Sequence, residues 1–195
     1  MTNHRKILFC LTGIFIAVLI AIIIALLTQG RHEYAQNIAV KACVWVIYTF
    51  IETKYSIEIK NTIRALVMAM LISDSFLGLY VNLYATSTIF DKIQHVFGSY
   101  AFSLFAYNLI CQITKPVISR TFSFIFVISL GLSVGVFYEI GEFIGDLIAK
   151  PSVPSQPSLL DTNLDLVADV IGSLIAAVHT ASIFPSSVRQ PAKIE

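Results

Sequence analysis

The chain has 195 residues, of which 56% are hydrophobic and only 13% are charged, and its formal net charge is +1. Soluble domains carry roughly 25% charged residues, so this composition excludes an ordinary water-soluble enzyme and a disordered tail. The near-neutral balance also provides no positive field for DNA or RNA, and no nucleic-acid partner is expected.

Apolar segments follow one another along the chain, and each is about as long as the roughly 20 residues that a helix needs to cross a bilayer. They cover about 7–27, 34–53, 64–85, 91–113, 121–149 and 162–184. No length is left for a soluble domain. The sequence therefore predicts an all-α fold, in which residues 1–195 form one polytopic membrane bundle of about six transmembrane helices.

Basic residues lie next to the first of these segments and within the second. The first follows Arg5 and Lys6 and is too long for the apolar region of a signal peptide, so we interpret it as a retained anchor. The second contains Lys41, whose ammonium group would have to extend towards the membrane interface. Whether residues 34–53 cross the bilayer completely is therefore left open by the sequence.

Basic residues are distributed unequally between alternate loops. With the N-terminus in the cytoplasm, the inner side would hold nine, namely Arg5, Lys6, Lys54, Lys60, Arg64, Lys115, Arg120, Arg189 and Lys193. The outer side would hold four, namely Arg31, Lys41, Lys92 and Lys150. Cytoplasmic loops carry the excess of Lys and Arg, so we expect both termini in the cytoplasm and the chain in the plasma (inner) membrane.

Acidic residues collect near the outer ends of the last three segments. Asp91 lies four residues before His95. Two further groups of acids are spaced by three or four, namely Glu139, Glu142 and Asp146 in the fifth segment, and Asp161, Asp165 and Asp169 in the sixth. Such spacing places side chains on one face of a helix. Since these helix ends share one side of the membrane, we expect the acids at a similar depth.

Carboxylates within a bilayer face the bundle interior or a wet cavity, and they need partners. The nearby bases are Lys92 and Lys150, which cannot neutralise seven acids. Three solutions stay open: protonation of some acids, solvation in an open vestibule, or a divalent cation among them. Oxygen ligands with one imidazole suit Zn²⁺, Mn²⁺ or Fe²⁺, and oxygens alone suit Mg²⁺ or Ca²⁺.

The residues that we predict to bind this metal are His95, Glu142, Asp165, Asp169, Asp91 and Glu139. A carboxylate that stays off the metal could act as general base, and Glu139 is the candidate. No GxSxG, Walker A or HExxH pattern is present, so serine or cysteine nucleophile chemistry has no support.

Structural interpretations compete with this one. Thr88 and Thr162 each stand three residues before an aspartate, as in a capping box, so Asp91 and Asp165 could simply cap helices. The other acids could hold neighbouring helices together through hydrogen bonds. Asp74, alone in the third segment, could be a proton relay or a hydrogen-bond partner of a neighbouring helix.

Glycine pairs at a spacing of four occur twice in the fifth segment. They are Gly131 with Gly135, and Gly141 with Gly145. Small residues at this spacing allow helices to approach closely. We expect packing within the bundle, and a dimer interface is the alternative.

Three blocks of sequence carry a resemblance to a known family. They are FDKIQH (90–95), YEIGEF (138–143) and DTNLDLVADVIG (161–172). Their order and spacing resemble the YjdF-like family of uncharacterised inner-membrane proteins and, more loosely, the VanZ-like proteins linked to glycopeptide-antibiotic resistance. The matching positions are Asp91, His95, Glu139, Glu142, Asp161, Asp165, Asp169 and Gly172. The resemblance implies a shared site and brings no activity with it.

Three functions remain open at this point. The first is a metal-dependent membrane enzyme that acts on a lipid-like or envelope substrate. The second is a cation or proton transporter or channel, because intramembrane acids often mark such pathways. The third is a non-catalytic assembly protein whose acids only hold the bundle together. The sequence does not indicate the oligomeric state.

Overall fold

The computed structural model describes residues 3–115, 119–150 and 154–183. Its elements are α1 (Asn3–Thr28), α2 (His32–Lys54), α3 (Asn61–Ser73), the π-helix η1 (Asp74–Tyr80), α4 (Leu83–Thr86), α5 (Phe90–Thr114), α6 (Arg120–Ala149) and α7 (Leu159–Ser182). With α3 and η1 taken together, six helices in the described residues are long and apolar enough to cross a membrane. The predicted all-α membrane bundle is confirmed. Phe184, where the sixth span was expected to end, lies outside the described residues.

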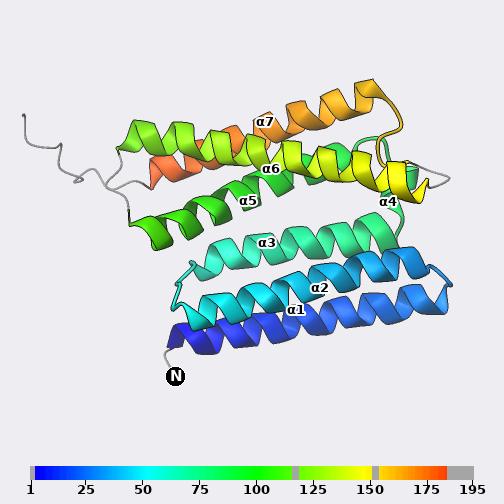
Figure 1. The fold of residues 1–195 in the computed structure, drawn as a ribbon, viewed down its shortest axis with the longest axis horizontal. Coiled ribbons are helices and arrows are strands. Elements are labelled where there is room, and N and C mark those ends of the chain that lie inside the picture. The colour runs from blue at the N-terminus through cyan, green and yellow to red at the C-terminus, as the bar shows by residue number, and fades with distance from the viewer. Residues whose placement is uncertain (1–2, 116–118, 151–153, 184–195) are drawn as a thin grey trace, which may run out of the picture.

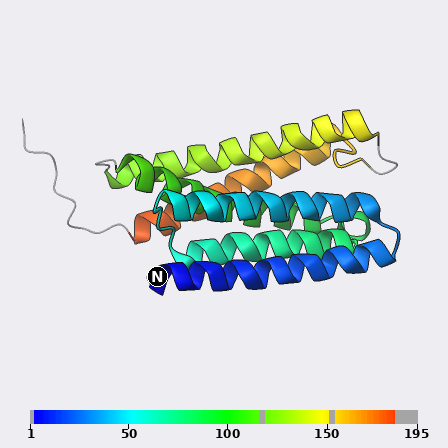
Figure 2. The same cartoon turned by 60° about the horizontal axis from the view of Figure 1, so that its bottom comes forward.

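The long helices form two groups of three. α1 and α2 pack together with α3, and α5, α6 and α7 pack closely on one another, while α3 and α5 join the two groups (Figures 1 and 2). Phe15, Trp45 and Val67 belong to the core of the first group. The outward faces stay apolar, with Phe137 72% and Ile148 76% exposed. This is the pattern expected where lipid covers the surface.

Successive helices run in opposite directions, so their ends gather at two opposite ends of the bundle. The N-terminus, the α2–α3 connection, the end of α5, the start of α6 and the end of α7 lie together, as Figure 1 shows. We call this the N-terminal end. The α1–α2 connection, α4, the start of α5, the end of α6 and the start of α7 form the opposite end. This grouping is the one that six crossings require. Arg189 and Lys193, two of the basic residues counted above, lie outside the described residues.

The third predicted span differs from a single helix over 64–85. α3 widens at Asp74 into the π-helical turns of η1, and the chain then breaks at Asn82, which has a left-handed φ of 69°. α4 follows as a single short turn. Such π-helical widening occurs often at functional sites, and here it buries Asp74.

The Lys41 side chain does not extend towards the membrane interface. It forms an ion pair with Asp74 of η1, and α2 runs as one continuous helix of 23 residues. Tyr84 donates a hydrogen bond to the other Asp74 oxygen at 2.8 Å. Asp74 therefore bonds to a neighbouring helix, which was one of its two expected roles.

Neither threonine caps a helix as the capping boxes predicted. Ser158 caps α7, its hydroxyl accepting a hydrogen bond from the Asp161 N–H at 3.1 Å, and the Ser87 hydroxyl accepts from the first residue of α5, Phe90, at 3.2 Å. The capping interpretation of Asp91 and Asp165 is wrong, because α5 has Ile89 at its N-cap position and α7 has Ser158, four residues before Thr162, at its own. Both carboxylates are free to face other helices.

Glycines allow α6 to lie close against α7. A Cβ atom on Gly131 would lie 2.1 Å from the Ser173 hydroxyl, and one on Gly135 would lie 2.2 Å from Asp169 Oδ2. Packing within the bundle is confirmed for this pair. Gly141 and Gly145 have nothing within 4 Å of an added Cβ in the described part of the chain, so they do not serve this contact.

Candidate functional site

His95 lies at the centre of the acidic cluster, at the opposite end of the bundle. It is 5% exposed, and the Tyr138 ring packs edge-on against its imidazole, with centroids 5.4 Å apart. Its Nε2 lies 3.8 Å from Asp91 Oδ1, 3.5 Å from Glu139 Oε1 and 3.8 Å from Asp165 Oδ1. One nitrogen therefore faces carboxylates from α5, α6 and α7.

The other imidazole nitrogen has its own partner. Nδ1 lies 3.3 Å from both oxygens of Asp169, which is 2% exposed. When Nδ1–H donates to this carboxylate, the lone pair of Nε2 is directed at the other three acids. A carboxylate behind a histidine in this way fixes the orientation of the ring and raises its basicity as a ligand.

Lys92 holds a separate group of aspartates together. Its ammonium nitrogen lies 3.2 Å from Asp91 Oδ2, 2.5 Å from Asp161 Oδ1 and 2.8 Å from both oxygens of Asp165. This one cation links α5 to the first two turns of α7. Among the described residues, Glu139 and Glu142 form no ion pair with a lysine or an arginine, so their charges lack a fixed cation.

The segment before α7 is hydrogen-bonded to the last part of α6. Gln156 Nε2 donates to Glu139 Oε2 at 2.6 Å and to the Glu139 carbonyl at 2.8 Å. The Asp146 carboxylate accepts the backbone N–H groups of Ser155 and Gln156 at 3.0 and 2.9 Å. Asp146 thus anchors this segment and stays out of the cluster, whereas Gln156 orients Glu139.

Three buried polar atoms in the cluster make no hydrogen bond within the described residues: His95 Nε2, Glu139 Oε1 and Asp165 Oδ1. The Asp165 atom still has its ionic contact with Lys92. An unsatisfied buried polar atom costs about 1–3 kcal/mol, so a group that bonds to these atoms would stabilise the cluster.

Two sets of side chains are arranged closely enough to share a metal ion. They are Asp91, His95 and Asp165, and His95, Glu139 and Glu142, with ligand atoms within 4.8 Å of one another in each set. Two ligands of a tetrahedral ion at about 2.1 Å lie about 3.4 Å apart. The 3.5 Å between His95 Nε2 and Glu139 Oε1 is close to this value. Both sets contain His95, so they describe one location.

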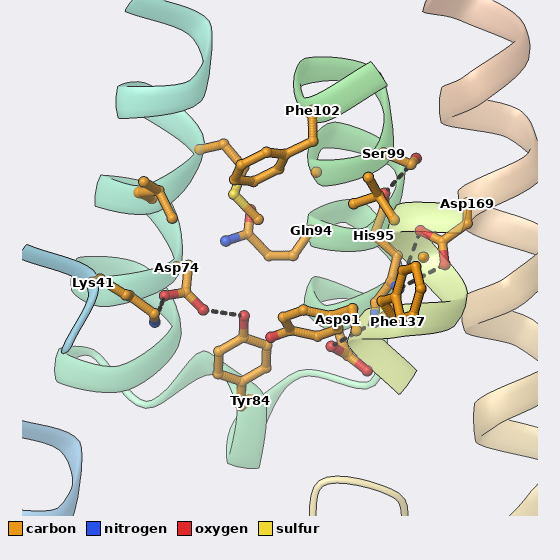
Figure 3. A pocket seen from close by; sticks show the side chains of 16 residues that line it. Lys41, Asp74, Tyr84, Asp91, Gln94, His95, Ser99, Phe102, Phe137 and Asp169 are labelled. Carbon is orange, nitrogen blue, oxygen red and sulfur yellow. Dashed lines mark hydrogen bonds and ion pairs between the residues drawn. The ribbon is translucent and has the colours of Figure 1, made fainter. Parts of the chain in front are cut away.

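A cavity of about 310 Å³ opens beside His95, between the two groups of helices. Figure 3 shows Asp91, His95 and Asp169 on one side of it, and the Lys41–Asp74–Tyr84 group on the other. The walls between them are mostly apolar. Burial, together with the Asp74 carboxylate, raises the pKa of Tyr84 above its usual value, so the phenol stays protonated and keeps donating.

Sequence reasoning missed part of this arrangement. Gln156, Gln94 and Tyr84 are uncharged residues whose positions carry no periodic signal. The acids were found because carboxylates are rare in apolar runs and repeat at helical spacing. All six predicted site residues lie at the cluster, but Asp169 faces Nδ1 while the other four acids lie on the Nε2 side.

Comparison with known proteins places the chain in a family. Residues 7–185 match the family described as predicted membrane protein (DUF2238). The chain belongs to this family. DUF2238 is the YjdF-like family, so that resemblance is confirmed, while the VanZ-like resemblance stays a prediction.

One relative extends the comparison. An uncharacterized protein of Thermotoga maritima is 30% identical over 115 residues, which is 59% of this chain and 59% of the relative. The chain thus matches little more than half the length of that protein. No solved structure matches the chain.

Proposed function

We propose that this DUF2238 protein is a membrane-embedded, metal-dependent enzyme that acts on a lipid-like or envelope substrate. The observation that carries the proposal is the pair of buried, unbonded atoms His95 Nε2 and Glu139 Oε1, 3.5 Å apart, with Asp169 behind the imidazole. This is the arrangement of a histidine ligand and its supporting carboxylate.

Charge favours a divalent ion over hydrogen bonding alone. Lys92 neutralises only the aspartates around it, and the carboxylates of Glu139 and Glu142 face His95 without a fixed cation in the described residues. A divalent cation would supply the two missing positive charges. One imidazole with carboxylate oxygens is a donor set that suits Zn²⁺, Mn²⁺ or Fe²⁺.

We assign His95, Glu139 and Glu142 as ligands, because no lysine or arginine of the described residues pairs with these two glutamates. A bound ion would activate a water molecule or polarise a carbonyl or phosphoryl oxygen. Asp165 Oδ1, 3.8 Å from His95 Nε2, is placed to accept a proton from such a water. Spacing alone favoured Glu139 as the base. The contact with His95 instead favours a ligand role for it, and Asp91 stays with Lys92 at the edge of the centre.

The substrate class follows from the location of the site. The cluster lies at the end of the bundle where the basic residues are few, and the loop-charge rule supports a position at the outer membrane surface. A reactive centre at this depth would meet the headgroup region of amphiphiles from the plasma membrane or the envelope.

The test is elemental analysis of the purified full-length protein. Wild type should contain about one equivalent of a transition metal, and His95→Ala and Glu142→Gln should lose it. Glu33→Gln, which removes an exposed acid from α2, and His179→Ala, far along α7, are the matched controls and should retain it. Wild type without stoichiometric metal, and without a fall in Tm in chelator, would refute the proposal.

A second measurement separates enzyme from transporter. Metal-loaded protein should cleave lipid-linked esters or phosphates in mixed micelles, and Asp165→Asn should abolish turnover while the metal remains bound. Bound metal with no turnover, but with cation flux into phosphatidylcholine vesicles, would assign the site to transport.

A further inference from the structure

The cavity beside His95 contains a second unsatisfied group, which lies outside the metal cluster. Gln94, one residue before His95 on α5, lines the cavity and is only 4% exposed. Its Oε1 accepts a hydrogen bond from the Ser73 hydroxyl of α3 at 3.1 Å. That bond leaves the Nε2 amino group without a hydrogen-bond partner in the described residues.

This amino group needs an acceptor. The Ser73 hydroxyl donates to the amide oxygen, so the amino group is the half of the amide that is left without a partner in the described residues. The NH₂ group can only donate, and a buried donor without a partner destabilises the structure. Gln94 therefore presents a hydrogen-bond donor to whatever fills the cavity.

The charges around the cavity determine which acceptor fits. Lys41 is neutralised by Asp74, and the Asp74 carboxylate is further bonded by Tyr84. The opposite side carries Asp91 and Asp169. No excess positive charge is available here to bind a phosphate or a carboxylate, so an uncharged oxygen is favoured.

The remaining walls of the cavity are mostly apolar. Met70 and Leu71 of α3 face Phe102 of α5 and Val134 of α6 around it. The cavity volume of about 310 Å³ is many times the space that a single water molecule needs. This space accommodates part of a single acyl chain and is too small for a two-chain lipid.

We propose that the cavity binds an acyl chain whose ester or amide carbonyl accepts a hydrogen bond from Gln94 Nε2. This placement would bring the carbonyl end of the substrate next to His95, so the inference rests on the proposed function for its chemistry but not for binding itself. Gln94 is then a specificity-determining residue for acyl compounds, and Ser73 is a positioning residue that acts through it.

The experiment uses the full chain in phosphatidylcholine nanodiscs. The probe is a decanamide with a photoreactive diazirine near the end of its chain, and the readout is the labelled peptide, found by mass spectrometry. We expect labelling of the cavity segments of α3, α5 and α6, with competition by methyl decanoate. Decane, which has the chain but no acceptor oxygen, should compete at least fivefold less well.

Variants link this labelling to the amide. Gln94→Leu keeps the side-chain volume but removes the donor, and it should reduce competed labelling about tenfold, whereas Ser73→Ala should reduce it less. Gln112→Leu makes the same change at an exposed position on the same helix and should label like wild type. Equal labelling of Gln94→Leu and wild type, or labelling spread evenly over the lipid-facing surfaces, would overturn the proposal.

Metal content distinguishes this proposal from the proposed function. Gln94→Leu should retain the metal, which also shows that the variant is folded, and Glu142→Gln should lose the metal but keep competed labelling. If Gln94→Leu proves unfolded, the Ser73→Ala result decides, and unchanged labelling in that variant counts against the role of Gln94. A protein without metal that still shows Gln94-dependent labelling would refute the metal centre alone.

Discussion

At the scale of single residues, the two nitrogens of His95 face different carboxylates of the cluster. Asp169 supports Nδ1, while Glu139 lies on the side of Nε2. Both carboxylates are buried, yet they face different nitrogens of the imidazole. In the proposed metal centre, Asp169 would orient the histidine ligand, and Glu139 would share the metal with it.

Asp169→Asn should therefore weaken metal binding without abolishing it. Loss of the carboxylate behind a histidine ligand costs about 10–100-fold in affinity, which Zn²⁺ titration of the metal-free protein would measure. Asp161→Asn removes a carboxylate that contacts only Lys92 and should change the affinity less than threefold. Equal effects of the two variants would contradict the supporting role of Asp169.

Tyr84 gives a second prediction at this scale, on pH. Its pKa is raised above the usual value of 10.0 in the folded protein, so the unfolded chain loses this proton first as the pH rises. The stabilisation is complete below pH 10.0 and declines above it. Tyr84→Phe should cost about 1–3 kcal/mol at pH 7, because it leaves the buried Asp74 oxygen without its donor.

The measurement is the difference in Tm between wild type and Tyr84→Phe, from pH 7 to pH 11. The difference should shrink above pH 10.0, since only wild type has this phenol to ionise. A constant difference over the whole range would show that the Tyr84 hydroxyl does not contribute through its proton.

At the scale of the elements, the close approach of α6 and α7 sets the geometry of the site. Gly135 lies directly against Asp169, so the helix contact and the support of His95 depend on the same few atoms. Small residues in membrane helices permit such approaches, and here one of them borders a functional side chain.

Gly135→Ala should destabilise the protein and weaken metal binding together. The new Cβ would lie 2.8 Å from the Asp169 Cβ, and the overpacking should cost about 1–3 kcal/mol. Gly141→Ala makes the same change on the same helix in open space and is the matched control. Thermal unfolding in detergent and Zn²⁺ titration measure the two effects. Identical behaviour of the two variants would contradict this account.

The elements also show what a sequence can predict. The long apolar runs gave six spans whose ends agree with the helices to within a few residues, except after Ser73. There the widening into η1 and the left-handed Asn82 depend on the Lys41–Asp74 pair and on Tyr84, contacts between segments far apart in the chain. The start of α7 was misplaced because Ser158 caps it four residues before the threonine that fits the capping pattern.

The site was predictable to a similar extent. Helical spacing identified the acids and His95, since ionisable residues stand out in an apolar chain. It could not distinguish which nitrogen each acid faces, because this depends on how far α7 slides along α5. Gln94 and Gln156 went unnoticed because uncharged amides are tolerated in many surroundings.

At the scale of the whole molecule, the polar groups are divided between the two ends of the bundle. The acidic cluster occupies one end, and most of the described basic residues occupy the other, including Arg64 in its ion pair with Glu52. The apolar cores of the two helix groups lie between them. The molecule thus has two chemically different ends, and the bilayer would keep them on separate sides.

Cysteine labelling tests the orientation. In a variant with Cys10, Cys43 and Cys111 replaced by alanine, a cysteine at Glu33 should react with a membrane-impermeant maleimide in intact cells. Glu58→Cys should react only after permeabilisation, because the basic residues that flank this loop favour a cytoplasmic location for it. The reverse pattern would place the acidic cluster on the cytoplasmic side.

The hydrogen bonds of Gln156 have a consequence for the whole site. This residue holds Glu139 by its side chain, and its backbone is held by Asp146, so the segment before α7 and the proposed ligand are energetically linked. Linkage is reciprocal. If the bonded segment raises the affinity of the centre for an ion by some factor, a bound ion that fixes Glu139 must favour the bonded position of the segment by the same factor. Occupancy of the centre would then be readable from outside the membrane, as slower hydrogen exchange of the Ser155 and Gln156 amides.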